Sequence, residues 1–389
     1  MIVSDPHRRL RRRLDSLPVG YPGGKAGMRL LRRLFSPDEA RIALGMDWRF
    51  RDPGAIAGAL REIGLSAEGL ESALDRMASK GSILKRATTG EYALMPFVVG
   101  MYEFQVSRLS RELVKDAGSF LYEGFALELL SSGEAQTRII PIGAAIRTEH
   151  RIACYEEFRA IIQGAGGRIA VLPCVCRTGA DLSGKPCRST DRRELCIVFR
   201  DYADTVVREG WGRALSTEEA LRIADENERE GLIMRPSNER EPQFLCACCG
   251  DCCALIAVVK AMRRPADFVS SNFRARVEGE SCVGCGSCAR RCPMEAISLR
   301  GRVALVQEGR CIGCGVCVPA CRPGAIRLER KAAIEPPKDT ESLLASLQAK
   351  RPTLAGRLLV GIKGLLGIPL ARRASRGAKR RAHPTPPPS

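Results

Sequence analysis

Eight of the chain's 18 cysteines stand in two short runs that share one spacing. The first run starts at Cys282 and the second at Cys311, and both have the form C-x2-C-x2-C-x3-C with a proline at or just after the end. Each run continues into an Ala-Ile-x-Leu segment, at 296–299 and 325–328. Two-residue spacers let three successive thiols wrap one compact centre, and thiolate sulfur is the soft donor that iron prefers. The spacing therefore predicts a repeated metal-binding unit.

Over about residues 280–330, the chain resembles bacterial dicluster ferredoxins. The resemblance implies two [4Fe–4S] clusters and one-electron transfer, with the fourth cysteine of each run bound to the cluster of the other run. It assigns one cluster to Cys282, Cys285, Cys288 and Cys321. It assigns the second cluster to Cys311, Cys314, Cys317 and Cys292. One departure is Arg322, which separates Cys321 from Pro323, and we expect ligation to survive it.

Glycines separate the ligands in both runs, at Gly284, Gly286, Gly313 and Gly315. We expect the backbone to pass close to inorganic sulfide there, where N–H groups can tune the reduction potential. Metal binding also couples to folding, so one interpretation is that the clusters only brace a small domain. Two adjacent clusters are explained more simply as an electron relay.

The start of the chain has no apolar segment of the secretory type. Tight groups of cysteines without such a signal indicate metal ligands in a reducing compartment, not disulfides. No run of 18 or more apolar residues is present, so we expect no membrane-spanning helix. These features predict a cytoplasmic protein. Cys154 stands apart from all groups, and we expect it to be a buried small hydrophobe.

A second cysteine field lies upstream of the repeat, with almost no histidine nearby, since His150 is the only histidine in the region expected to fold. Its members are Cys174, Cys176, Cys187, Cys196, Cys246, Cys248, Cys249, Cys252 and Cys253. The first four are candidates for a third [4Fe–4S] cluster, whose charge Arg177 and Lys185 would offset. The later five are candidates for a fourth cluster or for ligands to the third. A zinc site with four thiolates and a thiol redox relay stay open, because spacing alone does not show which cysteines share a site.

The whole chain resembles a group of iron–sulfur proteins of anaerobes, in which a winged-helix-like segment and a cysteine-rich domain precede a dicluster ferredoxin. The residues that carry this resemblance are 96–104, Leu172-Pro-Cys-Val-Cys-Arg177, Gly184-Lys-Pro-Cys187, Gly231-Leu-Ile and the run from Cys246 to Cys253. The resemblance implies an architecture and a setting in anaerobic metabolism, not a particular reaction.

The element pattern predicts an α+β chain. Ser36 and Glu39 form a capping box, helices follow at 55–63 and 66–80, and 82–95 is typical of a β-hairpin. Helix, helix, helix and hairpin is the order of a winged helix. We therefore divide the chain into a flexible basic N-terminus at 1–27, a winged-helix-like domain at 28–105, a helical and cysteine-rich domain at 106–275, a ferredoxin-like dicluster domain at 276–330, and a linker, an amphipathic basic helix and a disordered basic tail at 331–389.

The two ends, at 1–13 and 371–389, carry +10 of the net charge of +18. Such ends can contact nucleic acid, an anionic membrane or an acidic partner, or can be solvated without a specific role. A DNA-reading helix needs basic or amide side chains, whereas 66–80 carries Glu68, Glu71 and Asp75, so nucleic acid is disfavoured. The C-terminal basic helix has one apolar face, suited to a membrane surface, a partner or the chain's own core, and that face is formed by Leu358, Leu359, Ile362, Leu365 and Leu366.

The sequence favours an electron-transfer protein, free or as a subunit, that relays electrons to or from an oxidoreductase partner. It has no phosphate-binding loop, no dinucleotide fingerprint and no Ser–His–Asp pattern, which favours a carrier over a stand-alone enzyme. Two alternatives are a redox-sensing winged-helix regulator and an iron–sulfur reductase whose active centre lies in the 174–253 cysteine field. The sequence does not specify the electron donor, the acceptor or the oligomeric state.

Overall fold

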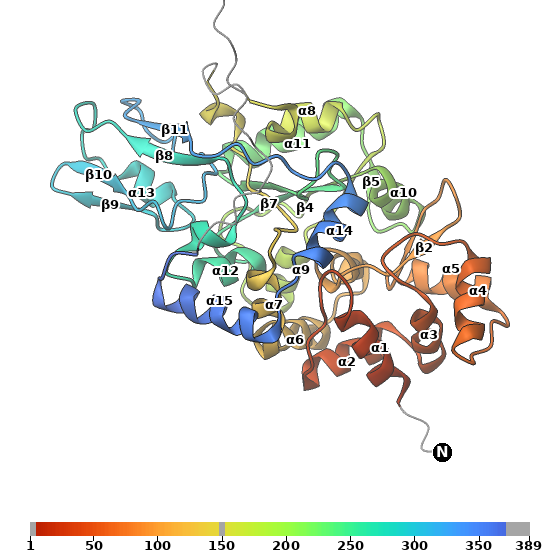
Figure 1. Ribbon diagram of the computed structural model, residues 1–389. Helices are drawn as coiled ribbons and strands as arrows, with labels where there is room; N and C mark the ends of the chain where they lie inside the picture. Colours follow the sequence, from red (N-terminus) through yellow and green to blue (C-terminus); the bar gives the residue numbers. More distant parts are fainter. Residues whose placement is uncertain (1–4, 148–151, 371–389) are drawn as a thin grey trace, which may run out of the picture.

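Residues 5–147 and 152–370 are described by the computed structural model. The N-terminal helices gather on one side of the molecule, the central sheet lies between, and the strands of the C-terminal cysteine runs lie on the other side (Figure 1). The mixture of helices and antiparallel sheets agrees with the α+β prediction. Among the described helices, none has both the length and the apolar character needed to cross a membrane.

Five helices and one hairpin form the N-terminal part. They are α1 (Pro6–Asp15), α2 (Lys25–Leu34), α3 (Pro37–Ile42), α4 (Pro53–Glu62), α5 (Leu70–Ser79), β1 (Leu84–Lys85) and β2 (Tyr92–Ala93). The capping box is confirmed, because Ser36 and Glu39 each accept a hydrogen bond from the backbone amide of the other. Helices α3, α4 and α5 and the hairpin follow in the expected order, and the winged-helix interpretation stays a prediction.

The expected flexible N-terminus at 1–27 is wrong for the residues that the structure describes. Helix α1 runs through the arginine-rich segment, where Leu10 and Leu14 lie one turn apart and are 0% and 3% exposed. Tyr21 stacks on Phe120 with ring centroids 4.4 Å apart. Because the leucines share one helix face, the arginines take the other faces. The arginine-rich segment therefore forms the outer side of the packed helix α1.

A histidine belongs to this packed segment. His7 is buried, and its Nε2 lies 2.8 Å from the Phe35 carbonyl oxygen. The expectation that His150 is the only histidine in a folded region is therefore wrong. His150 itself lies outside the described residues, as does the predicted basic tail at 371–389.

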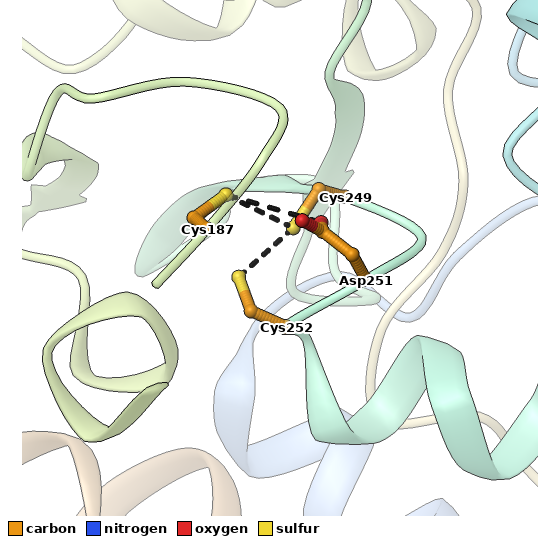
Figure 2. Close-up of side chains that lie close together, drawn as sticks. All are labelled: Cys187, Cys249, Asp251 and Cys252. Carbon is orange, nitrogen blue, oxygen red and sulfur yellow. Dashed lines mark hydrogen bonds between the residues drawn. The ribbon is translucent and has the colours of Figure 1, made fainter. Parts of the chain in front are cut away.

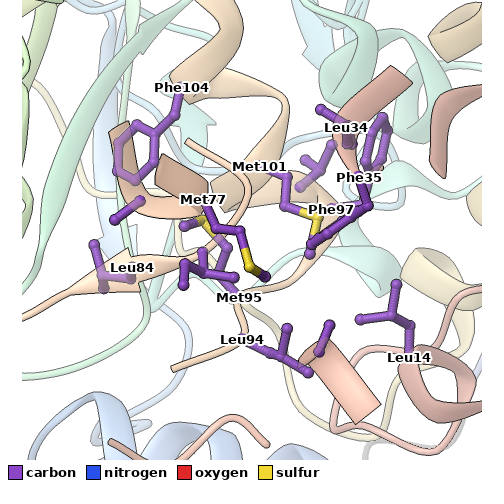
Figure 3. Packing of buried hydrophobic residues seen from close by; sticks show 14 of the residues in the cluster. Leu14, Leu34, Phe35, Met77, Leu84, Leu94, Met95, Phe97, Met101 and Phe104 are labelled. Atoms are coloured by element: carbon purple, nitrogen blue, oxygen red, sulfur yellow. The ribbon is translucent and has the colours of Figure 1, made fainter. Parts of the chain in front are cut away.

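Helix α5 begins at Leu70, later than the predicted start near Ser66. Gly69 precedes it in the left-handed conformation with φ of 63°, and Ser66 caps a short turn instead. Its Met77 lies in the apolar core that joins α1, α2 and α5 to the segment 94–104 (Figure 3).

A five-stranded antiparallel sheet in the order β5-β3-β4-β7-β6 forms the centre. Its strands are β3 (Ile169–Pro173), β4 (Glu194–Phe199), β5 (Arg213–Ala214), β6 (Ile233–Pro236) and β7 (Phe244–Cys248). The helices of this region are α6 (Arg111–Phe120), α7 (Ala126–Ser131), α8 (Phe158–Gln163), α9 (Val175–Leu182), α10 (Arg200–Arg208), α11 (Thr217–Arg229) and α12 (Ala254–Lys260). Cysteines stand at the starts of two helices, because Cys174 caps α9 and Cys253 caps α12.

Two antiparallel strand pairs and one short helix form the region of the repeat. β8 (Phe273–Val277) pairs with β11 (Ile326–Arg330), β9 (Ile297–Arg300) pairs with β10 (Val303–Val306), and α13 (Ser287–Arg291) lies within the first cysteine run. Both Ala-Ile-x-Leu segments therefore lead into strands. The predicted domain boundary at 276 falls inside β8, because this strand completes a sheet with the far end of the repeat.

Residues 331–370 hold more structure than the predicted linker and single helix. Helix α14 (Thr340–Ala349) begins after Asp339, whose side chain accepts from the Ser342 amide. Its Leu343 and Leu347, one turn apart, are buried in the N-terminal core. The segment after Pro336 and Pro337 therefore folds back onto the N-terminal part of the chain and packs against its core.

Helix α15 (Leu354–Leu366) is the predicted amphipathic helix, but its apolar face points away from the protein. A Cβ atom at Gly361 would lie 2.9 Å from Leu127, and one at Gly364 would lie 2.6 Å from Phe268, so the glycines form the packed face. The apolar side chains are half exposed or more, namely Leu354, Leu358, Leu359, Ile362, Leu365 and Leu366. The alternative that this apolar face packs on the chain's own core is therefore wrong.

One buried carboxylate holds α15 and the N-terminal segment together. Glu128 of α7 accepts from the Gly20 amide at 2.9 Å and from Arg351 Nε at 3.0 Å, and it pairs with Arg357 of α15. Its side chain is 4% exposed. The arginine that interrupts the apolar pattern of α15 therefore faces inward and anchors the helix.

We expect Glu128→Gln to lower the free energy of unfolding by roughly 3 kcal/mol, because the partly buried guanidinium of Arg357 loses its anion and that of Arg351 keeps only Asp15. Chemical denaturation of the anaerobically purified protein measures this loss. Glu218→Gln is the matched control, because Glu218 and Arg222 are both exposed and such a pair contributes less than about 1 kcal/mol. Equal, small losses in both variants would contradict the anchoring role.

Candidate metal centres

Cysteines of both runs meet in the first predicted ligand set. Cys282 and Cys288 come from the first run, and Cys321 from the end of the second lies close enough for its charge to act on Cys288. Burial raises the pKa of Cys288, and the negative charges of Cys321 and Cys282 nearby raise it further. Cys285 is exposed, so this group of thiols reaches the molecular surface.

The second predicted ligand set lines one buried cavity, formed by Cys292, Cys311, Cys314 and Cys317 with apolar neighbours. Burial raises the pKa of Cys314 to about 12, and the charges of Cys292 and Cys311 act in the same direction. Burial likewise raises the pKa of Cys317. Cys292 comes from the first run and its three companions from the second. The structure therefore brings together the exchanged fourth cysteine and its predicted partners.

Backbone amides donate to the sulfurs of both sets. Ala275 N lies 3.3 Å from Cys311 Sγ, and Ala304 N lies 3.4 Å from Cys282 Sγ. A third amide, from Ala296, lies 3.3 Å from Cys292 Sγ. Amide donors stabilise thiolates and are a means of tuning iron–sulfur centres. The soft donors, the cavity and the amide contacts all fit a thiolate-bound iron–sulfur cluster.

The glycines between the ligands have a conformational reason as well as the predicted one. Gly284, Gly286, Gly313 and Gly315 all have φ between 70° and 77°, a region that other residues rarely adopt. A Cβ atom at Gly313 would lie 2.1 Å from the Phe273 carbonyl oxygen. The close approach observed at Gly313, and likewise at Gly284 against Arg302, is therefore to neighbouring backbone.

The nine cysteines of the second field separate into two groups. Six of them line a single cavity of about 60 Å³ beneath the central sheet, and these are Cys174, Cys176, Cys196, Cys246, Cys248 and Cys253. This group is called the six-thiol cavity below. A water molecule needs about 10–15 Å³, so the space suits a group of several atoms. Cys174 and Cys176 come from the start of α9, Cys196 from β4, Cys246 and Cys248 from β7, and Cys253 from the start of α12.

The six thiols are neighbours in a closed ring, in the order Cys174, Cys176, Cys253, Cys248, Cys246, Cys196 and back to Cys174. These contacts hold the pKa of alternate thiols, Cys174, Cys246 and Cys253, well below the usual range. They raise the pKa of the intervening Cys176, Cys196 and Cys248. The ring thus gathers thiolates in a protein interior.

Two arginines supply positive charge to this cavity. Burial opposes the charge of Arg177, but the thiolates of Cys174 and Cys249 outweigh it and raise the pKa of its guanidinium. The pKa of Arg235 is raised against burial in the same way, by Cys248 and its neighbours. Lys185, which was also expected to offset charge, is exposed instead.

Arg177 carries donors that lack protein partners. Its side chain is 1% exposed, and Nη1 donates to the Ala247 carbonyl oxygen at 2.9 Å and to Cys174 Sγ at 3.4 Å. Its Nε and Nη2 are buried and find no hydrogen-bond partner among the residues that the structure describes. Buried donors of this kind are costly unless a partner is present. This arginine therefore fits an anionic group in the six-thiol cavity.

The remaining three thiols form a separate compact group with one carboxylate (Figure 2). Cys187, Cys249, Cys252 and Asp251 place their ligand atoms within 4.8 Å of one another. The grouping of Cys187 with Cys174, Cys176 and Cys196 is therefore wrong, because the loop after α9 carries Cys187 to the β7–α12 turn. This set is called the Cys187 group below.

Sequence reasoning missed three residues of these sites. Asp251 lies between Cys249 and Cys252 in a C-x-x-C segment, so its proximity to the thiols could have been noted. Glu103 and Arg235 line the six-thiol cavity from distant parts of the chain, and no spacing signal links them to it. The expectation for Cys154 was also wrong, because this residue is exposed at a short surface turn.

A model of the 4Fe-4S dicluster domain matches residues 274–322. No curated protein and no solved structure matches the chain. The C-terminal cysteine runs are thus similar to iron–sulfur dicluster domains, which supports an iron–sulfur protein with a role in electron transfer. The match covers β8 and both cysteine runs but none of the second cysteine field.

We expect Gly313→Ala to destabilise the region of the repeat, since the left-handed backbone costs about 1–2 kcal/mol and the new Cβ collides with the Phe273 carbonyl oxygen. Denaturant unfolding and iron content measure the change. Gly324→Ala is the control, because Gly324 has φ of 70° and nothing within 4 Å of its Cβ position. Similar losses in both variants would show that the close approach at Gly313 is unimportant.

Proposed function

We propose that the chain is an iron–sulfur electron-transfer protein that holds two [4Fe–4S] clusters in the region of the repeat and relays electrons to or from an oxidoreductase partner. Cys282, Cys285, Cys288 and Cys321 would hold one cluster, and Cys311, Cys314, Cys317 and Cys292 the other. The observation that carries the proposal is the meeting of each three-cysteine group with the fourth cysteine of the other run. Such clusters accept and donate single electrons when bound.

We further propose that the six-thiol cavity holds an additional iron–sulfur cluster. Four thiolates suffice for a cubane, and the cavity offers six. The buried, partly unpaired guanidinium of Arg177 and the nearby Arg235 support an anionic occupant. A mononuclear ion fits less well, because the thiols stand around a space several times that of a water molecule.

The contact between the two cysteine fields supports a continuous route for electrons from one field to the other. A Cβ atom at Gly250, in the turn after β7, would lie 2.8 Å from the Pro293 carbonyl oxygen, so this turn packs directly beside Cys292. Thiols of the six-thiol cavity and of both predicted ferredoxin sets belong to one buried apolar cluster. The second cysteine field is therefore next to the cavity of Cys292, Cys311, Cys314 and Cys317.

The proposed site of partner contact is the surface around Cys285, where the first ferredoxin ligand set reaches the molecular surface. Cys285 is exposed and Val283 beside it is 56% exposed. Two exposed arginines lie at this point, since Arg290 Nη1 donates to the Cys285 carbonyl oxygen and Arg302 lies against Gly284. A partner with an acidic surface would be attracted and oriented by them. We therefore place the exchange of electrons with the partner at the Cys285 surface.

A second candidate function, an iron–sulfur reductase, has one specific observation in its favour. Glu103 lines the six-thiol cavity, and burial raises the pKa of its carboxyl to about 8, with the charges of Cys246 and Cys253 adding to the effect. A protonated carboxyl would then lie beside the thiols at neutral pH, as a proton donor requires. The regulator alternative gains nothing from α5, because Asp75 is held by Lys85 and Tyr92 of the hairpin.

Iron and acid-labile sulfide content test the number of clusters. Two [4Fe–4S] clusters give about eight irons per chain, and a further one gives about twelve. We expect about twelve or more in the anaerobically purified protein, and a loss of about four in the triple variant Cys176→Ser, Cys196→Ser and Cys248→Ser, which leaves only three of the six thiols. Cys154→Ser, which changes an exposed cysteine outside all groups, should keep the full content. A wild-type content near eight would remove the additional cluster, and one near zero would remove the electron-transfer proposal.

We also propose that α15 docks the protein on an anionic membrane surface. Six apolar side chains face outward along the helix, and the sequence that follows, 371–389, contains six lysines and arginines and no acid. Apolar burial and attraction to anionic lipid act together in peripheral binding. The inward anchoring of Arg357 supports this use, because it keeps the apolar face outward.

Co-sedimentation with phosphatidylserine-containing vesicles measures this docking. We expect the double variant Leu358→Ser and Leu365→Ser to bind at least about tenfold more weakly, because each change removes about 1 kcal/mol of apolar burial. Val207→Ser is the control, since Val207 is an exposed apolar residue of α10. Iron content should be unchanged in all variants. Binding of the double variant equal to wild type would rule out α15 as the docking element.

A further inference from the structure

We propose that the Cys187 group binds one zinc ion through three thiolates and a carboxylate. The ligands would be Cys187, Cys249, Cys252 and Asp251. This site is separate from the proposed iron–sulfur sites and does not depend on them. Zinc takes four ligands in tetrahedral geometry from cysteine, histidine and acidic side chains.

The spacing of the ligand atoms fits a single ion. With Zn–S bonds of about 2.3 Å, two sulfurs of a tetrahedral site lie about 3.8 Å apart. Two of the distances match this spacing, since Cys187 Sγ lies 3.9 Å from Cys249 Sγ and 3.8 Å from Asp251 Oδ1. Cys249 Sγ lies 3.0 Å from Cys252 Sγ, so these two sulfurs would move apart by about 0.8 Å on binding the ion.

The other cysteines differ from this compact group. Among the residues that the structure describes, the eight cysteines of the repeat and the six of the cavity form no set of three or more ligand atoms all within 4.8 Å of one another. An iron–sulfur cluster binds its cysteines on separate irons and therefore holds them farther apart than one ion does. Compactness thus separates the Cys187 group from the iron–sulfur sites.

The carboxylate of Asp251 lies beside the three thiols (Figure 2), and hydrogen bonds from neighbouring residues hold it there. Asp251 Oδ2 accepts from the Arg188 amide at 2.7 Å, and Oδ1 accepts from Ser189 Oγ at 3.1 Å. Such outer contacts fix a ligand before the ion arrives.

The charge balance also fits. Three thiolates and one carboxylate exceed the two charges of the ion, so a cation nearby is needed. Arg177 meets this need, because the charges of Cys249, Cys252 and Cys187 all act on its buried guanidinium. The same guanidinium contacts Cys174 of the six-thiol cavity, so one arginine serves both sites.

The place of the ion gives it a structural role. Cys249, Asp251 and Cys252 lie in the turn that contains Gly250, and Gly250 packs on Pro293 beside Cys292. Cys187 comes from the loop that follows α9. A zinc ion would tie this loop to the turn and so hold the contact between the second cysteine field and the region of the repeat.

Metal analysis of the full chain tests the proposal. We expect about one zinc per chain in wild type purified anaerobically without chelators, with zinc lost in Cys187→Ser and reduced in Asp251→Asn. Iron content should stay at the wild-type value in both variants. Cys154→Ser should keep both metals. Loss of iron without loss of zinc in the triple variant Cys176→Ser, Cys196→Ser and Cys248→Ser would show that the two kinds of site are independent.

Zinc-edge X-ray absorption of the wild-type protein decides the question even where a variant fails to fold. A shell of three sulfurs and one oxygen supports the site, and a shell of four sulfurs or of oxygens and nitrogens alone overturns it. Two other results also overturn it. One is a zinc-free protein in which Cys249 and Cys252 form a disulfide, and the other is a loss of about four irons in Cys187→Ser.

Discussion

The gathering of many thiolates in one apolar core is the constraint on which the rest of the structure depends. Cys174, Cys249, Cys288 and Cys314 all belong to the same buried cluster. Thiolates in a low-dielectric interior repel one another unless a metal or a cation neutralises them. Arg177, buried between the six-thiol cavity and the Cys187 group, contributes to both. A substitution at this one position would therefore disturb two sites at once.

The central sheet brings the cysteines of the six-thiol cavity together. Strands β3, β4 and β7 are neighbours, so residues that are far apart in sequence reach one cavity. Leu172 pairs with Cys196 in register, and Arg235 pairs with Cys246. Cys174 and Cys253 lie at helix starts, where backbone amides and the helix dipole favour a thiolate. The cavity is thus lined by rigid elements and not by loops alone.

Ligands that are close together in the sequence could be predicted, whereas ligands that only the fold brings together could not. Spacing fixes three cysteines of each run around one centre, and resemblance to ferredoxins supplied the exchange of Cys292 and Cys321. The division of the second field depends on strand order, which no spacing contains. By contrast, the packing of α1 and α14 was readable, because Leu10 and Leu14, like Leu343 and Leu347, stand one helical turn apart. The arginines of α1 led to the prediction of a flexible segment, and Pro336 and Pro337 before α14 led to the prediction of a linker.

The outward face of α15 and the buried ligands of the repeat are linked by a short chain of contacts. Gly364 packs against Met262 and Phe268, and Arg310, next to Cys311, donates to the Met262 carbonyl oxygen. Packed interiors deform little, so α15 and the region of the repeat keep a fixed relation. Any surface that α15 binds therefore also sets the direction in which the exposed Cys285 faces. The fold therefore fixes the orientation of Cys285 relative to any surface that α15 contacts.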